Sequence, residues 1–312
     1  MTIVQLEYIV AVANQGSFSR AAEACGVTQP TLSMQIQKLE AELGITIFDR
    51  SKQPIKTTPL GEEILAQARA NLQGMRRIKE IIAEQASEVK GQLRIGIIPT
   101  LAPYLLPLFV KDFLEQYPLV QLSIEELVSE QIIQKLQQDN LDVGILVTPL
   151  KDRTILEIPL FYETFVAYMS SNHPLIHHDF IALQDLNIDE MLLLSEGHCF
   201  REQVVNICPE SRQREFPGQL RFESGSLETL KRIIENDFGY TLLPELAVLN
   251  LPAEKRKYLR ELTYPKPVRE VSLALHRGIL KRNLIEALQA EILENIPASL
   301  KDGSRGKVVG WR

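Results

Sequence analysis

The hydrophobic periodicity of this 312-residue chain changes near residue 90, and that change limits its fold more than any other feature. Before it, apolar residues recur every three or four positions, which is the spacing of helix faces. After it, short apolar runs alternate with helical segments, as in βαβ units of a mostly parallel sheet. We therefore expect an all-α N-terminal part followed by an α/β part, consistent with about 150 residues per domain.

Residues 1–44 predict three short helices separated by turns that contain glycine. Gly16 ends the first helix, and Ser17 offers its hydroxyl as the N-cap of the second. Thr28 caps the third helix, with Pro30 in its first turn, where a missing N–H is tolerated. Helices connected in this way form a helix-turn-helix.

The third helix has one apolar and one polar face. The apolar residues expected in the core are Leu32, Ile36, Leu39 and Leu43. The opposite face carries hydroxyls, amides and a lysine and has no carboxylate in its first three turns, a set that the major groove of DNA accepts. After Gly44, two short strands around a turn predict a basic wing that contacts the DNA backbone or minor groove, with Lys56 among its cations. The candidate DNA-binding residues are Gln29, Pro30, Thr31, Ser33, Met34, Gln37, Lys38, Arg50 and Lys52.

The net charge of the N-terminal part does not decide whether it binds DNA. Residues 1–90 are formally neutral, and the net charge of −6 lies in residues 91–312. Nucleic-acid binding depends on where cations lie more than on their sum, so neutrality does not exclude it. The alternative is a three-helix packing module whose polar face is merely solvated.

Residues 59–88 predict one long helix that begins near Pro59. About 30 residues span about 45 Å, too long for a 58-residue module to cover. We expect a dimerisation helix, since a DNA reader with two half-sites needs a dimer; a helix folded back on its own domain is the alternative. The apolar stripe consists of Ile64, Ala68, Leu72, Met75, Ile78 and Ile82.

Residues 89–312 predict two Rossmann-like α/β lobes with a cleft between them. Lobe I covers about 91–162 and 268–300, and lobe II covers about 163–267. The last dozen residues show no clear element. Strands are expected at 93–98, 120–127, 141–147, 165–170, 191–195, 220–224, 240–244 and 271–276, and helices at 103–116, 131–138, after residue 198, at 226–236 and at 280–293.

Composition excludes several other classes. Hydrophobic residues make up 45% of the chain, enough for sizeable cores. No apolar run reaches the roughly 18 residues of a membrane helix, and the first residues lack a secretory signal. Three cysteines do not make a secreted disulfide framework. We expect a cytoplasmic protein without membrane contact, and the absence of common catalytic motifs predicts that it is not an enzyme.

Residues 18–50, FSRAAEACGVTQPTLSMQIQKLEAELGITIFDR, resemble the winged helix-turn-helix of LysR-type transcriptional regulators. The resemblance continues through a linker helix and a two-lobed, periplasmic-binding-protein-like effector domain. Residues 192–208 and 226–248 are similar to the peroxide-sensing activators of that family. The resemblance implies homodimers that assemble to a homotetramer on promoter DNA, activate antioxidant genes through RNA polymerase, need no cofactor and are reset by a thiol reductant such as glutaredoxin or thioredoxin.

The resemblance also implies roles for individual residues. Cys199 would react with hydrogen peroxide and Cys208 would resolve the product as a disulfide. Pro209 stands where the family has an aromatic residue, which bears on how the oxidised segment packs. The implied peroxide pocket consists of Thr100, Ser129, His198 and Arg269, with Ser129 in place of a common threonine.

The residues around the two thiols agree with such a switch. Cys199 lies at an expected helix start, where backbone N–H groups favour the thiolate, and a sulfenic acid condenses with a second thiol. A helix between the cysteines holds their Cα atoms about 13 Å apart on opposite faces. A disulfide needs about 4.4–6.8 Å, so the segment must unwind for the bond to close.

Three alternatives remain at this point. Both cysteines can be inert and buried, as Cys25 is expected to be in the helix-turn-helix core. A regulator of the same architecture can instead bind a small metabolite between the lobes. A thiol peroxidase or solute-binding protein with an unrelated N-terminal module is the third. His173, His177 and His178 are expected to form a solvated loop and not a metal site.

Overall fold

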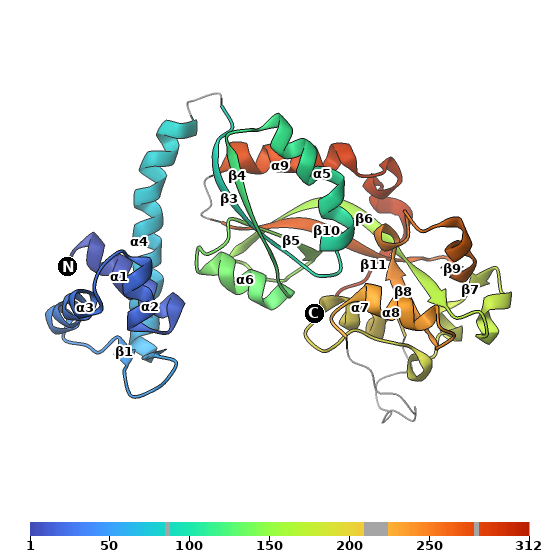
Figure 1. The fold of residues 1–312 in the computed structure, drawn as a ribbon, viewed down its shortest axis with the longest axis horizontal. Coiled ribbons are helices and arrows are strands. Elements are labelled where there is room, and N and C mark those ends of the chain that lie inside the picture. Colours follow the sequence, from blue (N-terminus) through green and yellow to red (C-terminus); the bar gives the residue numbers. More distant parts are fainter. Residues whose placement is uncertain (85–87, 209–223, 278–280, 312) are drawn as a thin grey trace. The chain divides into compact units, whose positions relative to one another are not determined.

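The computed structural model describes residues 1–84, 88–208, 224–277 and 281–311 (Figure 1). The chain divides into two compact units, Met1–Ser87 and Glu88–Arg312. The helix expected as a separate linker is therefore part of the first unit. No helix in the described ranges is long and apolar enough to cross a membrane.

The first unit is a winged helix-turn-helix. The Ser17 hydroxyl accepts from the Arg20 N–H and the Thr28 hydroxyl from the Thr31 N–H, as predicted, and Gly44 ends the third helix with φ of 68°. Leu43, expected in the core, is 37% exposed because it is the last residue of its helix. The elements are α1 (Ile3–Gln15), α2 (Phe18–Ala24), α3 (Gln29–Leu43), β1 (Phe48–Asp49), β2 (Lys56–Thr57) and α4 (Pro59–Glu84).

The apolar stripe of α4 divides into two parts. Its 26 residues span about 39 Å. Ala68 and Leu72 are buried in the core of the first unit together with Leu65, whereas Met75 and Ile78 are 43% and 63% exposed. The first half of the stripe thus packs against the core of its own unit, whereas the residues of the next turns are exposed. The side chain of Ile82 lies outside the described part.

The second unit is built on a mixed, curled sheet with the strand order β4-β3-β5-β10-β6-β9-β7. Strand β3 is parallel to β4 and β5, but β10 runs antiparallel to β5 and β6. A mostly parallel sheet was thus the wrong expectation. The elements are β3 (Gly91–Ile97), α5 (Ala102–Gln116), β4 (Val120–Glu126), α6 (Ser129–Gln137), β5 (Val143–Thr148), β6 (Ile155–Met169), β7 (Phe180–Ile181), α7 (Cys199–Ile207), α8 (Leu227–Ile234), β8 (Tyr240–Pro244), β9 (Leu259–Leu262), β10 (Pro267–His276), α9 (Arg282–Asn295) and β11 (Lys307–Val308).

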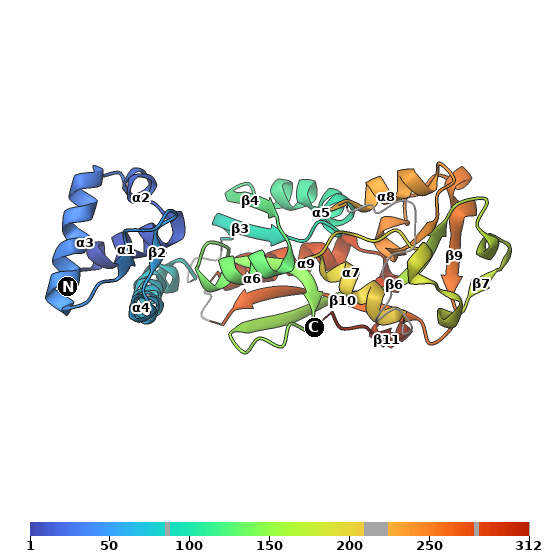
Figure 2. The same ribbon diagram turned by 90° about the horizontal axis from the view of Figure 1, so that it is seen from below.

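Strand β6 joins the two lobes (Figures 1 and 2). Its residues 155–164 pair with β10, and residues 165–169 pair with β8. Strand β10 also pairs with β5, which confirms that it returns to the first lobe. Residues 191–195 form only isolated bridges at Met191 and Leu194, not the expected strand. Most of the strand expected at 220–224 lies outside the described residues.

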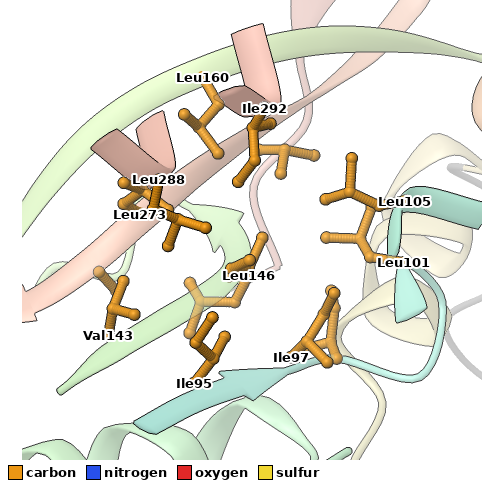
Figure 3. Packing of buried hydrophobic residues seen from close by; sticks show 14 of the residues in the cluster. Ile95, Ile97, Leu101, Leu105, Val143, Leu146, Leu160, Leu273, Leu288 and Ile292 are labelled. Carbon is orange, nitrogen blue, oxygen red and sulfur yellow. The ribbon is translucent and has the colours of Figure 1, made fainter. Parts of the chain in front are cut away.

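Each lobe has its own hydrophobic core. Figure 3 shows the first, in which Leu146 of β5 lies among Leu105 of α5 and Ile292 of α9. Helix α6 approaches the sheet so closely that a Cβ on Gly144 would lie 2.5 Å from the Ile132 side chain. The turn before α5, the N-termini of α6 and α7, and strands β6 and β10 supply the side chains of the candidate site.

Candidate functional site

Helix α7 carries one cysteine at each end. Cys199 is its first residue and Cys208 its C-cap, and both are reduced thiols. Cys199 is 4% exposed and belongs to the core of the first lobe, whereas Cys208 is 3% exposed and packs in the second. The predicted helix is confirmed. Nine residues of helix place the Cα atoms about 13 Å apart, so these thiols cannot bond without unwinding α7.

A fully buried ion pair lies beside Cys199. The Arg269 side chain, on β10, is paired at 2.6 Å with Glu163 on β6, and neither is accessible to solvent. Arg269 also donates to the Thr100 hydroxyl at 3.0 Å and to the Thr100 carbonyl at 3.3 Å. Glu163 accepts a second hydrogen bond from the Leu246 N–H at 2.9 Å. A buried charge pair persists only when such bonds satisfy its remaining polar atoms.

The Cys199 thiol is affected by this pair and by Ser129. Burial raises its pKa above the ordinary value, and the Ser129 hydroxyl, the Arg269 charge and the helix N–H groups lower it by less. The N–H groups at the helix start thus favour the thiolate, as expected, but burial is the larger effect and the net pKa is raised. The buried Ser129 hydroxyl is close enough to influence the sulfur, yet no atom of the described residues meets it with good hydrogen-bond geometry.

His198 is less integrated into the site than Thr100 or Ser129. It occupies the N-cap of α7 but makes no capping hydrogen bond. Its Nε2 lies 3.4 Å from where a Cβ on Gly225 would be, so the ring packs against that glycine. Burial lowers the pKa of His198, so the imidazole is neutral at pH 7.

Cys208 has a different environment. Burial alone raises the pKa of its thiol to about 11. Its cluster neighbours are apolar and include Phe200, Val204 and Tyr240. An inert resting thiol is the chemical consequence, since only the thiolate is a nucleophile.

The candidate DNA-binding surface lies on α3 and the wing. Seven of its predicted residues are exposed: Gln29, Pro30, Thr31, Met34, Gln37, Lys38 and Lys52. Ser33 is partly buried. The exposed Arg50 is held by α3, since its guanidinium pairs with Glu40 at 3.0 Å and packs 4.9 Å from the centre of the Phe18 ring. The polar face of α3 is thus accessible, with one wing cation fixed against it.

Comparison with known proteins identifies the family. Models described as "Bacterial regulatory helix-turn-helix protein, lysR family" and "LysR substrate binding domain" match residues 3–62 and 86–297. The "Hydrogen peroxide-inducible genes activator" of Haemophilus influenzae is 35% identical, covering 97% of this chain and 99% of that one. The chain belongs to the LysR family of transcriptional regulators.

Within the LysR family the chain is of the OxyR type. The "DNA-binding transcriptional dual regulator OxyR" of Escherichia coli is 35% identical over 94% of this chain and 95% of that protein. The solved full-length OxyR C199D of Pseudomonas aeruginosa is 35% identical and superimposes with a TM-score of 0.80, covering 95% and 99%. The periplasmic-binding-protein-like fold expected for residues 89–312 is confirmed by this match.

Sequence reasoning missed two residues of this LysR-type site. Glu163 neutralises Arg269, and Phe200 places its ring 5.3 Å below the guanidinium. A signal for Glu163 was present, because FYETF puts a carboxylate inside an apolar strand, and a buried charge requires a partner. Nothing in the sequence distinguished Phe200 from other core aromatics.

The structure also corrects the expected positions of Cys25 and of His173. Cys25 is only partly buried at the C-cap of α2, not inside the core. In the histidine loop His177 and His178 are exposed, but His173 is buried and its Nδ1 accepts from the Leu175 N–H, so that residue is structural. The described residues contain no cluster that could hold a metal ion.

Proposed function

We propose that this LysR-type regulator senses hydrogen peroxide through Cys199 and is switched by a reversible Cys199–Cys208 disulfide. The relatives named as hydrogen peroxide-inducible activators support the signal. The observation that carries the mechanism is one helix with a thiol at each end, one beside a buried cation and the other in an apolar core.

The chemistry balances with peroxide as the only oxidant. The Cys199 sulfur attacks one peroxide oxygen, the O–O bond breaks, and the departing hydroxide takes the thiol proton to give water. The resulting sulfenic acid then forms the S–S bond with Cys208 and releases a second water. Two thiols lose two electrons, and one peroxide becomes two waters.

Each residue of the proposed peroxide pocket has a separate role in the reaction. Arg269 stabilises negative charge as it develops on sulfur and on the departing oxygen. Thr100 accepts from Arg269, so its own proton remains available to a peroxide oxygen. The Ser129 hydroxyl has no good partner in the described structure and supplies a second contact. The neutral His198 lies at the N-cap of α7, next to Cys199.

The remaining steps are proposed by analogy with the LysR family. We propose that the protein acts in the cytoplasm as homodimers that assemble to a homotetramer and not as an enzyme. The exposed half of the α4 stripe would form the dimer contact, and the α3 face would enter the major groove of promoter DNA. Oxidation would change the spacing of the DNA contacts and the recruitment of RNA polymerase, and glutaredoxin or thioredoxin would restore the thiols.

The decisive experiment combines thiol analysis with footprinting. One equivalent of peroxide per chain should produce the Cys199–Cys208 disulfide by peptide mass spectrometry and change the footprint on the protein's own upstream DNA. Two thiols that remain reduced contradict the proposal. Lys38→Ala should lower DNA affinity and reduce the salt slope by about one, and Lys111→Ala, on the exposed side of α5, should not.

A second candidate is a regulator that binds a metabolite. A pocket of about 540 Å³ is lined from both lobes, with Tyr104 of α5 and Lys231 of α8 in its wall. Cys199 is not among its lining residues. If this alternative holds, Cys199→Ser leaves induction by the metabolite intact. If the peroxide proposal holds, the same variant loses induction by peroxide.

A further inference from the structure

The C-terminal tail, residues 307–311, holds α7 in place. Strand β11 pairs in parallel with the start of β10, and the Val309 N–H donates to the Val268 carbonyl at 2.8 Å. On the opposite side the tail accepts two hydrogen bonds from α7. Gln203 Nε2 donates to the Val309 carbonyl at 2.7 Å and Asn206 Nδ2 to the Gly310 carbonyl at 2.9 Å.

These contacts connect the two halves of the thiol site. The tail pairs with Pro267 and Val268, directly before Arg269, while its two acceptor carbonyls hold the helix that begins with Cys199. The Trp311 indole N–H donates to the Val147 carbonyl at 3.1 Å, which ties the end of the tail to β5. The tail therefore fixes the helix of the reactive sulfur relative to the strand of its cation.

Gln203 depends on the tail. Its side chain is fully buried, and its Oε1 is without a hydrogen-bond partner among the described residues. The bond to Val309 is therefore the only side-chain hydrogen bond of Gln203 among the described residues, and losing it leaves both ends of this buried amide unsatisfied. Gln203 and Asn206 are three residues apart, so both project from one face only while α7 is helical.

We infer that Gln203 and Asn206 are positioning residues for the thiol reaction, acting through a tail that is released when the disulfide forms. Both residues lie between the two cysteines, so unwinding this segment separates the donors that hold the tail. The tail contacts exist only with the reduced helix and therefore oppose disulfide formation. This inference rests on the proposed function, since release requires the Cys199–Cys208 bond.

Trp311 offers a direct test, because it is the single tryptophan of the chain. In the full-length protein, peroxide should shift its emission to longer wavelength in step with the disulfide measured by mass spectrometry. Cys208→Ser, which retains every tail contact, should show no shift. A disulfide without an emission change overturns the release of the tail and leaves the proposed function standing; no disulfide at all overturns the proposed function.

A thiol–disulfide equilibrium measures the positioning effect. Deletion of residues 309–312 removes both acceptors without altering α7, and should shift the equilibrium with glutathione toward the disulfide by roughly tenfold. Lys307→Ala keeps both acceptor carbonyls and should leave the equilibrium unchanged. An unshifted equilibrium in a truncated protein with native circular dichroism overturns the role of the tail, and the Trp311 measurement on the intact chain does not depend on truncation.

Discussion

The two ends of α7 contain the same functional group in contrasting surroundings. Cys199 and Cys208 are almost equally buried, at 4% and 3% exposure. Burial raises the pKa of both thiols, to about 11 at Cys208, but at Cys199 the Ser129 hydroxyl and the Arg269 charge act against it. Exposure therefore does not distinguish the attacking thiol from the resolving one. The groups around each sulfur do.

This contrast explains why the reaction has an order. A peroxide oxygen near Cys199 meets a cation and hydroxyl donors, which stabilise the charge that develops as the O–O bond breaks. Near Cys208 it would meet aromatic and aliphatic side chains. The helix keeps the two environments apart until the first thiol is oxidised.

The largest expected effect separates the two cysteines completely. Cys199→Ser should abolish trapping of a sulfenic acid by dimedone, because burial raises the pKa of the Cys208 thiol to about 11 and only the thiolate attacks peroxide. Cys208→Ser should keep the trapped product and accumulate it, because no second thiol consumes it. Mass spectrometry of both variants in a Cys25→Ser background measures this, with untreated protein as the control. Equal trapping in the two variants would remove the distinction between the ends.

The second prediction concerns stability at the Cys199 end. Arg269→Met should lower the free energy of unfolding of the second unit by about 3–5 kcal/mol, because it leaves Glu163 buried and uncompensated. Urea unfolding followed by circular dichroism measures the loss. Replacing both partners, as Arg269→Met with Glu163→Leu, should recover most of it. If the single variant loses less free energy of unfolding than the double variant, the ion pair does not stabilise the Cys199 end of α7.

The third prediction concerns pH. Because burial raises the pKa of Cys199 above the usual value of about 8.5, the thiolate fraction should grow about tenfold per unit and about 100-fold between pH 6 and 8. The rate of sulfenic acid formation in Cys208→Ser should follow it. Circular dichroism at each pH controls for unfolding. A plateau below pH 7 would show that Arg269 and Ser129 outweigh burial.

Much of this fold was accessible from the sequence. Local rules located the caps at Ser17 and Thr28, and apolar periodicity located α5, α7 and α9 because each helix presents one continuous face to a core. The antiparallel pairing of β10 was not accessible, since an apolar run such as VSLALH shows burial but not direction. The tail was missed because its ordering comes from side chains of α7, far away in sequence.

The site was accessible in part. Thr100 and Arg269 came from the family resemblance, and the structure brings them together through a hydrogen bond. The net pKa of Cys199 could not be predicted from its place at a helix start. That value depends on how deeply the sulfur is buried, which follows from the packing of α7 between two lobes and not from neighbouring residues in the chain.

The smallest expected effect tests the hydroxyl beside Cys199. Because Ser129 has no good hydrogen-bond partner among the described residues, Ser129→Ala should leave the free energy of unfolding nearly unchanged. The same variant should slow sulfenic acid formation about tenfold, since one hydrogen bond to the reacting oxygens is lost. Stopped-flow kinetics in Cys208→Ser measures the rate, and Ser129→Thr, which keeps the hydroxyl, should restore it. A hydroxyl that matters to the rate but not to stability belongs to the reaction, whereas a variant that is destabilised and reacts normally would assign Ser129 to packing and leave Arg269 as the feature that distinguishes this end of α7 from the other.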